Sequence, residues 1–367
     1  IAIEIGSTPK WSWLGWVGMC ALFMILSFFS VIAGWALAYI FKTASGTFTG
    51  MSPDEVGATF GQFLHNPGAL VGWHAAFMIC TVFIVARGIK GGIERAVTIM
   101  MPTLFVMLIG LVIYGMFAGE FLQAVDYLFT PDFSKITPQV TLAAVGQAFF
   151  SVNVGIGGVL TYAAYLPDDA DLVSSSFIVV LGDTLVALLA GLMIFPIVFA
   201  YNLDPAQGPG LIFVTLSTAF ANMPGGSLIG AAFFSLIFLA ALTSSISMLE
   251  TSVSRLEEIK GSSRAKMAMA LGSGIFLFGL LTVFSFNYIE DFHPLGFIKM
   301  FENKTAFDLL DFLTLNIIMP LGGLTYAIFV GWWLTKEMKM ETLGLKDELL
   351  FKVWHFLIRY VVPIAVI

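Results

Sequence analysis

The sequence predicts an all-α polytopic membrane protein, and three observations support this fold class. Hydrophobic residues make up 58% of the 367 positions and charged residues only 11%, whereas soluble domains carry about 25% charged residues. The mean hydropathy is +0.93. The apolar residues also gather into runs of about 20, the length that an α-helix needs to cross a bilayer. We therefore expect a bundle of membrane-spanning helices.

Counting these runs gives nine expected spans. The runs 14–41 and 96–119 are the clearest, because neither contains Asp, Glu, Lys or Arg. The complete set is 14–41, 67–86, 96–119, 141–165, 172–201, 226–254, 267–286, 312–335 and 349–367.

The basic residues between the spans predict the orientation of the chain. If the spans alternate across the membrane, twelve Lys and Arg residues fall on one side and four on the other, with Arg359 inside the last span. Cytoplasmic loops carry the excess of Lys and Arg. We therefore place residue 1 on the cytoplasmic side and residue 367 on the external side.

The uncharged stretch between the fifth and sixth spans is too long for one crossing. Between Asp204 and Glu250, 45 residues carry no charge. The first part, PAQGPGLIFVTLSTAFANMPGG, is bracketed by Pro and Gly, which favours a short external helix. This helix either acts as a lid over an outward-facing cavity or simply covers the bundle.

A polar island interrupts the fourth span. The stretch GQAFFSVNVGIGG, residues 146–158, places Gln147, Ser151 and Asn153 among four glycines. Backbone at membrane depth must bond within the protein or line a wet cavity. Glycines alone would favour close helix packing. With three polar side chains they favour a discontinuous helix whose free carbonyls face an ion or a charged substrate.

A second island, LAALTSSISMLE, occupies residues 239–250 and carries four hydroxyl groups. Thr243 and Ser247 share one helix face by their i, i+4 spacing. Hydroxyl and carbonyl oxygens together suit a hard cation. In the alternative interpretation, each hydroxyl bonds to a carbonyl of its own helix. The pattern leaves both open.

The third island is a single carboxylate, Asp183, in LGDTLVALLAG. A charge inside a span is costly, and by default it marks an ion pathway or a paired site. A buried ion pair is the alternative, but no Lys or Arg lies within the neighbouring helical turns. This favours a functional role for Asp183.

Other function classes find little support in the sequence. Cys20 and Cys80 lie within spans and resemble buried small side chains rather than a disulfide or metal site. The four histidines are scattered, and we expect polar contacts near helix ends for them. No catalytic set or phosphate loop can be assembled, so we expect no enzyme activity, no organic cofactor and no nucleic-acid partner. A channel would need repeated rings of charged side chains, which the single carboxylate Asp183 does not supply.

Four motifs resemble the neurotransmitter:sodium symporter family, to which the bacterial leucine transporter belongs. GQAFFSVNVGIGGVLTYAAY, residues 146–165, resembles the unwound sixth helix of that family. GIKGGIERAVTIMMP at 88–102, GDTLVALLAG at 182–191 and AALTSSISMLE at 240–250 occur in the family's order. The motifs run from residue 88 to residue 250, and their shared order makes the resemblance specific.

This resemblance implies a transporter fold of two inverted five-helix repeats in a single domain, residues 1–367. The nine spans would be helices three to eleven, so that the chain lacks helix one and most of helix two. Residues 1–119 would be the remainder of the first repeat, 136–335 the second, and 349–367 helix eleven. The implied location is the lipid bilayer of the bacterial inner membrane, and a homodimer is compatible with it.

The resemblance also implies two sodium sites, a substrate pocket and two gates. One sodium site would use Ser151 and Asp183, and the other the Ala240 carbonyl with Thr243 and Ser244. Acidic or tyrosine gate residues would be Asp311 on the external side and Glu258 and Tyr165 on the internal side. The substrate pocket would comprise Ile25, Phe29, Phe150, Ser151, Asn153, Ile156, Ser244, Ser247 and Met248.

Three positions depart from the family pattern. Phe29 stands where a tyrosine usually touches the substrate carboxylate, and Asn153 replaces a small hydroxyl residue or Gly. Asp183 replaces an asparagine and adds a negative charge where animal members recruit chloride. We expect the Asp183 charge to make transport independent of chloride.

The resemblance therefore implies a sodium-coupled symporter that imports an amino acid or a related small amine by alternating access. The alternative is a non-transporting, sodium-dependent sensor or accessory subunit that retains the fold. The Phe29 substitution and the missing helix one keep this alternative open.

Overall fold

Helices account for nearly all the regular structure in the computed structural model of the chain. The structure describes residues 11, 13–152, 155, 157–167, 170–203, 205, 210–344 and 348–366, and none of these residues lies in a strand. The predicted pocket residues Asn153 and Ile156 lie outside the described residues. The remaining predicted site residues are all described.

The chain divides into two compact units, each built from separate stretches of sequence. The first unit comprises Ile1–Ile25, Asp132–Leu185 and Leu310–Ile367, and the second comprises Leu26–Pro131 and Val186–Leu309. This division does not test the predicted residue bounds of the two repeats, which remain a prediction.

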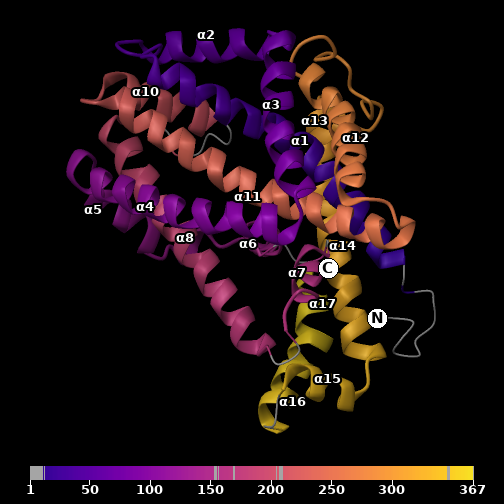
Figure 1. Ribbon diagram of the computed structural model, residues 1–367. Helices are drawn as coiled ribbons and strands as arrows, with labels where there is room; N and C mark the ends of the chain where they lie inside the picture. The colour runs from indigo at the N-terminus through magenta and orange to yellow at the C-terminus, as the bar shows by residue number, and fades with distance from the viewer. Residues whose placement is uncertain are drawn as a thin grey trace. The chain divides into compact units, whose positions relative to one another are not determined.

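Within the described residues, seven helical segments are long and apolar enough to cross a membrane, and each overlaps a predicted span (Figure 1). They are α1 (Trp13–Ala44), α3 (Pro67–Ala86), η2 (Ile89–Glu94) with α4 (Arg95–Ala118), α8 (Leu172–Ala200), α11 (Gly226–Lys260), α12 (Arg264–Phe284) and the run from α13 to η7 (Ala306–Trp333).

The two other predicted spans, 141–165 and 349–367, are helical but differ from simple apolar spans. The first is broken into α6 (Pro138–Ser151) and α7 (Gly158–Ala163). The second is built from α16 (Glu348–Phe356), the π-helical segment η8 (Leu357–Val361) and α17 (Val362–Val366). These three elements include the charged side chains of Glu348, Lys352 and Arg359.

Shorter elements connect these helices, and their starts follow local sequence signals. α2 begins at Pro53 behind a capping box in which Ser52 and Glu55 exchange hydrogen bonds. The others are α5 (Phe121–Phe129), η3 (Phe133–Lys135), η4 (Leu211–Thr215), α10 (Leu216–Asn222), η5 (Lys299–Phe301) and α15 (Lys336–Leu343). The run from 306 to 333 consists of α13 (Ala306–Leu313), η6 (Thr314–Ile318), α14 (Met319–Ile328) and η7 (Phe329–Trp333).

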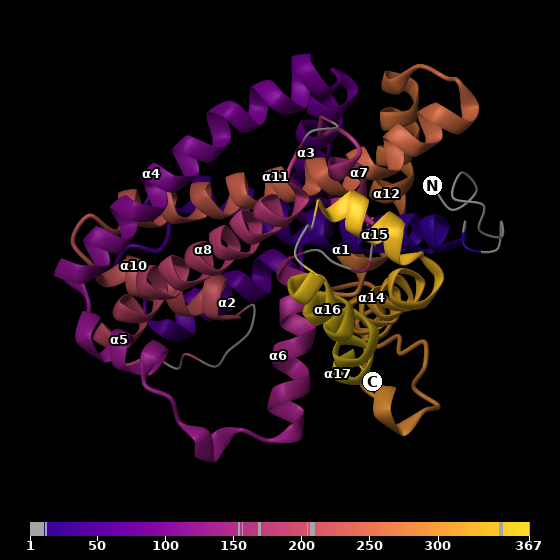
Figure 2. The same cartoon turned by 90° about the horizontal axis from the view of Figure 1, so that it is seen from below.

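Small residues set the helix packing of the second unit. A Cβ atom added at Gly272 of α12 would lie 2.2 Å from Val82 on α3, and one at Gly279 would lie 2.6 Å from the Ser27 carbonyl oxygen of α1. Glycine at these positions lets the helices approach closely, as is common in membranes. α11 contacts α3, α4, α10 and α12 in the same unit (Figures 1 and 2).

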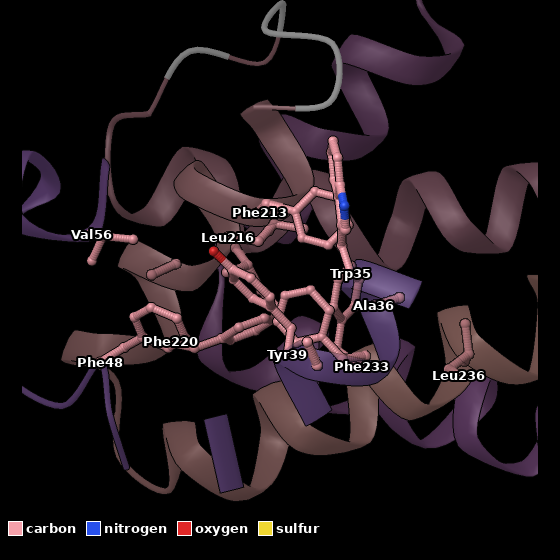
Figure 3. Packing of buried hydrophobic residues seen from close by; sticks show 14 of the residues in the cluster. Trp35, Ala36, Tyr39, Phe48, Val56, Phe213, Leu216, Phe220, Phe233 and Leu236 are labelled. Carbon is pink, nitrogen blue, oxygen red and sulfur yellow. The ribbon is translucent and has the colours of Figure 1, made fainter. Parts of the chain in front are cut away.

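Aromatic side chains form the centre of the second unit (Figure 3). The Tyr39 ring of α1 lies 5.1 Å, centroid to centroid, from both Phe213 of η4 and Phe234 of α11. Residues 216–221 of α10 are all buried. The predicted short helix is therefore present at 211–222, and it contributes to this core. Such packing agrees better with a covering helix than with a loose lid.

Candidate ion and substrate site

The break between α6 and α7 creates non-helical backbone in the middle of a predicted span. α6 ends at Ser151 and α7 begins at Gly158. Gly155 has φ +96° and Gly157 has φ +80°, a region that residues with a side chain rarely adopt. The prediction of a discontinuous helix is confirmed, and the glycines explain where the helix stops.

The unwound segment is held against α14 by a contact between glycines of the first unit. A Cβ atom at Gly155 would lie 2.5 Å from the Met319 carbonyl oxygen, and one at Gly322 would lie 2.1 Å from the Gly155 carbonyl oxygen. Both distances are too short for any side chain. The sequence around the break therefore fixes the path of the backbone as well as its lack of helix.

Ser151 and Asp183, predicted as ligands of one sodium ion, are in contact within the first unit. The Ser151 hydroxyl donates a hydrogen bond to Asp183 Oδ2 at 2.5 Å. Ser151 is the last residue of α6, and helix C-terminal ends favour cations. Among the described residues, no Lys or Arg forms an ion pair with Asp183. Its charge is thus available to a cation.

The hydroxyl groups of α11 bond mainly to their own helix. Thr243 donates to the Ala240 carbonyl oxygen at 2.9 Å, and Ser247 donates to the Thr243 carbonyl oxygen at 3.1 Å. Ser245 is buried and lies 2.9 Å from the Thr81 hydroxyl of α3. Ser244 is exposed. Thr243 and Ser247 therefore fit the interpretation in which a hydroxyl bonds to a carbonyl of its own helix. The Thr243 bond also places its hydroxyl oxygen beside the Ala240 carbonyl oxygen, and both residues are predicted sodium ligands.

The predicted substrate residues are distributed over both units. Ile25 is buried and Phe29, one turn later on α1, is half-buried. Met248 of α11 is buried, whereas Phe150 of α6 is 37% exposed. Ile25, Phe150 and Ser151 belong to the first unit, and Phe29, Ser244, Ser247 and Met248 belong to the second.

Each predicted gate residue either contacts a neighbour in the sequence or lies within a helix. Glu258 of α11 forms an ion pair with Arg255, with 2.6 Å between Oε2 and Nη1. Asp311 lies inside α13, which begins at Ala306. Thr305 caps this start, because its hydroxyl accepts from the Asp308 amide while the Asp308 carboxylate accepts from the Thr305 amide. The Tyr165 ring lies 6.4 Å from that of Tyr162. Their gating roles remain predictions.

A buried ion pair in the second unit was not predicted. Glu250 of α11 is fully buried and pairs with Arg264 at the start of α12. Arg264 also donates to the Val85 carbonyl oxygen of α3 at 3.0 Å and approaches Glu257 at 3.3 Å. Glu250 is a carboxylate inside the predicted span 226–254, so the rule applied to Asp183 would have found it.

Comparison with known proteins identifies the family. The model of the sodium:neurotransmitter symporter family matches residues 55–317, which is more than half of the chain. The chain belongs to the sodium:neurotransmitter symporter family. Its members are transporters rather than enzymes, and they depend on sodium. This family member is therefore a multi-pass membrane protein with a small-molecule substrate.

Curated relatives match almost the full length of the chain. An uncharacterized sodium-dependent transporter of Bacillus subtilis (strain 168), YhdH, is 38% identical over 98% of this chain and 79% of the relative. An uncharacterized sodium-dependent transporter of Haemophilus influenzae is 34% identical over 99% of this chain and 79% of the relative. The chain thus spans about four-fifths of each relative.

A solved structure shows the same fold. The crystal structure of MhsT in complex with L-phenylalanine superimposes with a TM-score of 0.87 at 39% sequence identity, over 98% of this chain and 80% of MhsT. The inverted-repeat transporter fold expected from the sequence is confirmed by this match.

Proposed function

We propose that this protein is a sodium-coupled symporter that imports an amino acid or a related small amine by alternating access, without a requirement for chloride. The observation that carries the proposal is the Ser151–Asp183 contact at the break of a membrane helix. The likeness to MhsT, crystallised with L-phenylalanine, supports an amino acid as substrate.

One sodium ion binds at Ser151 and Asp183 in this proposal. Hard cations prefer oxygen ligands, and here a hydroxyl and a carboxylate oxygen lie 2.5 Å apart. The break in the helix leaves carbonyl groups without their usual helical partners, as in other transporters whose half-helix ends coordinate sodium. The full negative charge of Asp183 supplies the charge balance that chloride would otherwise give.

The second sodium ion binds on α11 at Ala240, Thr243 and Ser244. The Ala240 carbonyl oxygen and the Thr243 hydroxyl oxygen are 2.9 Å apart, so one ion can contact both. The hydroxyl of Ser244 is exposed and follows directly in sequence. Since each hydroxyl oxygen carries two lone pairs, Thr243 can accept an ion without losing its bond to Ala240.

Within the second unit, the substrate contacts Phe29 of α1 and the 244–248 stretch of α11. Phe29 and Met248 offer apolar surface, while Ser244 and Ser247 offer hydroxyl groups. Phe29 lacks the phenolic hydroxyl that family members direct at a substrate carboxylate. We therefore expect the substrate carboxylate to be held by fewer side-chain donors than in those members.

The energy available from sodium is sufficient for accumulation. Each ion that enters down a potential of 100 mV releases about 2.3 kcal/mol, and a tenfold concentration gradient adds about 1.4 kcal/mol. One ion thus sustains roughly a several-hundred-fold substrate gradient. Coupling requires that sodium and substrate raise each other's affinity, which is reciprocal by linkage.

A thermal-unfolding screen of the full-length protein tests this proposal. A panel of amino acids and small amines is added in sodium chloride, sodium gluconate and potassium chloride, since a ligand that binds the folded state raises its midpoint. The proposal expects one compound to raise the midpoint equally in both sodium salts and not in potassium. No response to sodium in any condition would contradict the assigned ion ligands.

An Asp171→Asn variant serves as the control for Asp183→Ala in this screen. Asp171 is exposed and caps the start of α8 by accepting from the Val173 and Ser174 amides, a role that Asn can also fill. We expect Asp183→Ala to weaken the sodium response, because one of the two proposed sites is lost, and Asp171→Asn to retain the full response. Equal responses of the two variants would remove Asp183 from the site.

A further inference from the structure

A basic cavity lies in the first unit, apart from the predicted ion ligands. Its volume is about 240 Å³, and its lining comes from two segments, 331–339 and 351–359. These segments carry η7, α15, α16 and η8, which gather at one end of α14 (Figure 1). Pockets for drug-sized ligands measure about 300–1,000 Å³, so this one suits a smaller chemical group.

Four basic side chains line the cavity: Lys336, Lys339, His355 and Arg359. Lys339 is only 5% exposed, and its ammonium group donates to the Gly331 carbonyl oxygen at 3.3 Å. The described lining residues include no Asp or Glu. Burial, together with the nearby charge of Arg359, lowers the pKa of Lys339. A buried cation with no carboxylate among the described lining residues is costly, so an anion would stabilise this arrangement.

Two buried side-chain nitrogens of the cavity also lack hydrogen-bond partners in the described part of the chain. Arg359 Nε and His355 Nδ1 are buried and have no hydrogen-bond partner among the described residues. The Arg359 guanidinium is oriented by aromatic rings, with its centre 5.3 Å from the Trp332 ring centroid and 5.6 Å from that of Tyr360. An oriented guanidinium with free donors matches the oxygens of a phosphate group.

The backbone of both walls is irregular where Arg359 approaches. Gly331 lies in the π-helical segment η7, and Arg359 lies in the π-helical segment η8. A Cβ atom at Gly331 would lie 3.2 Å from the Arg359 Cα atom. π-Helical turns occur frequently at functional sites. Here they bring the arginine stem against the opposite wall.

The surroundings of the cavity have the character of a membrane interface. Trp333, Tyr360 and Trp332 are 54%, 46% and 42% exposed, and such aromatic residues typically mark headgroup depth. The predicted orientation puts the connection between residues 336 and 352 on the cytoplasmic side, where anionic lipids attract basic residues. At the rim, Glu348 lies 3.4 Å from both Lys336 and Lys352, so it offsets part of the Lys336 charge.

We propose that this cavity binds the phosphate of an anionic phospholipid headgroup from the cytoplasmic leaflet. Lys339 and Arg359 contact the phosphate oxygens, Lys336 contributes charge from the rim, and the exposed tryptophan and tyrosine rings lie beside the lipid. The proposal is independent of the sodium and substrate ligands.

The test titrates the detergent-purified full-length protein with dioctanoyl phosphatidylglycerol, dioctanoyl phosphatidylcholine or inorganic phosphate at constant ionic strength. The midpoint of thermal unfolding gives the apparent Kd for each. The variants are Arg359→Gln and Lys336→Gln, and Lys336 is exposed enough for its variant to fold. The control is Lys90→Gln, which removes an exposed charge on the same predicted side of the membrane.

We expect phosphatidylglycerol to raise the midpoint saturably with the same Kd in wild type and Lys90→Gln, and phosphatidylcholine to have no such effect. Arg359→Gln should weaken binding about tenfold, or about 1.4 kcal/mol, and Lys336→Gln about fivefold. Equal shifts with both lipids, or equal losses in Lys336→Gln and Lys90→Gln, would overturn the site. A shift with inorganic phosphate as large as that with phosphatidylglycerol would overturn the lipid as its source.

Discussion

Asp183 carries the charge on which the proposed chloride independence depends. Its carboxylate lies 2.5 Å from the Ser151 hydroxyl. Removing this charge in Asp183→Asn leaves the sodium ligands with a neutral amide, so we expect the apparent sodium affinity to fall about tenfold or more, in line with the loss of one charge-assisted interaction. Chloride should then restore part of the affinity.

Uptake measured in sodium chloride and in sodium gluconate checks this prediction. Wild type and Asp171→Asn should transport equally in the two salts, while Asp183→Asn should transport faster in chloride. A wild-type protein that requires chloride would contradict the role given to Asp183.

The Glu250–Arg264 pair is predicted to be a strong contributor to stability. Removing one partner of a buried ion pair leaves an uncompensated charge, which costs about 3–5 kcal/mol. We expect Glu250→Gln and Arg264→Gln each to lower the midpoint of thermal unfolding by several degrees, with the double variant less affected than the two losses combined. The matched control is Glu258→Gln, from an exposed pair on the same helix that should contribute little. Equal shifts for Glu250→Gln and Glu258→Gln would contradict this account.

Some residues of the site and of the buried ion pair could be identified from the sequence, and others could not. Ser151 and Asp183 were both identifiable because each is a polar residue in an apolar span, and the family resemblance supplied their pairing. The partner of Glu250 was not identifiable, because it depends on a tight reversal of the chain. α11 ends at Lys260 and is capped by Gly261 with φ +59°, and α12 begins at Arg264. Only this turn returns Arg264 to the buried carboxylate.

The break between α6 and α7 is the element that positions the proposed first sodium site. A methyl group at Gly322 would collide with the Gly155 carbonyl oxygen. Gly322→Ala is therefore expected to displace the unwound segment and to lower the apparent sodium affinity at least tenfold, with a smaller effect on the helices. Sodium titration followed by thermal unfolding measures this effect.

Gly110→Ala is the matched control for that substitution. Gly110 also lies in a membrane-spanning helix, α4, but an added Cβ there meets no atom within 4 Å. We expect its sodium affinity to equal that of wild type. Comparable losses in both variants would show that the glycine contact does not position the site.

The ends of helices were predicted well where glycine or polar residues interrupt an apolar run, and less well elsewhere. The glycines of 155–158 marked the break correctly. The start of α13 lies at Ala306, six residues before the predicted span, because Thr305 and Asp308 form a cap in polar sequence that hydropathy does not register. The π-helical segments η6, η7 and η8 could not be predicted, because the spacing of apolar residues does not distinguish them from an α-helix.

At the scale of the whole molecule, the apolar composition and the order of four motifs were enough to predict the fold that the MhsT match confirms. The two structural units mix distant parts of the sequence, and hydropathy says nothing about which spans pack together. That grouping depends on small-residue contacts such as those of Gly272 and Gly279. Substrate identity is likewise set by side-chain shape around the ligand, which motif order does not encode.

The proposed function requires that sodium drives substrate movement through this protein. The most direct measurement is accumulation of the amino acid found in the thermal screen by proteoliposomes that contain the full-length protein, under an inward sodium gradient with gluconate as the anion. We predict accumulation well above the external concentration, lost when the gradient is collapsed and absent in Asp183→Ala. Sodium-dependent binding of that amino acid without any accumulation would contradict the claim and identify a sensor or accessory subunit instead.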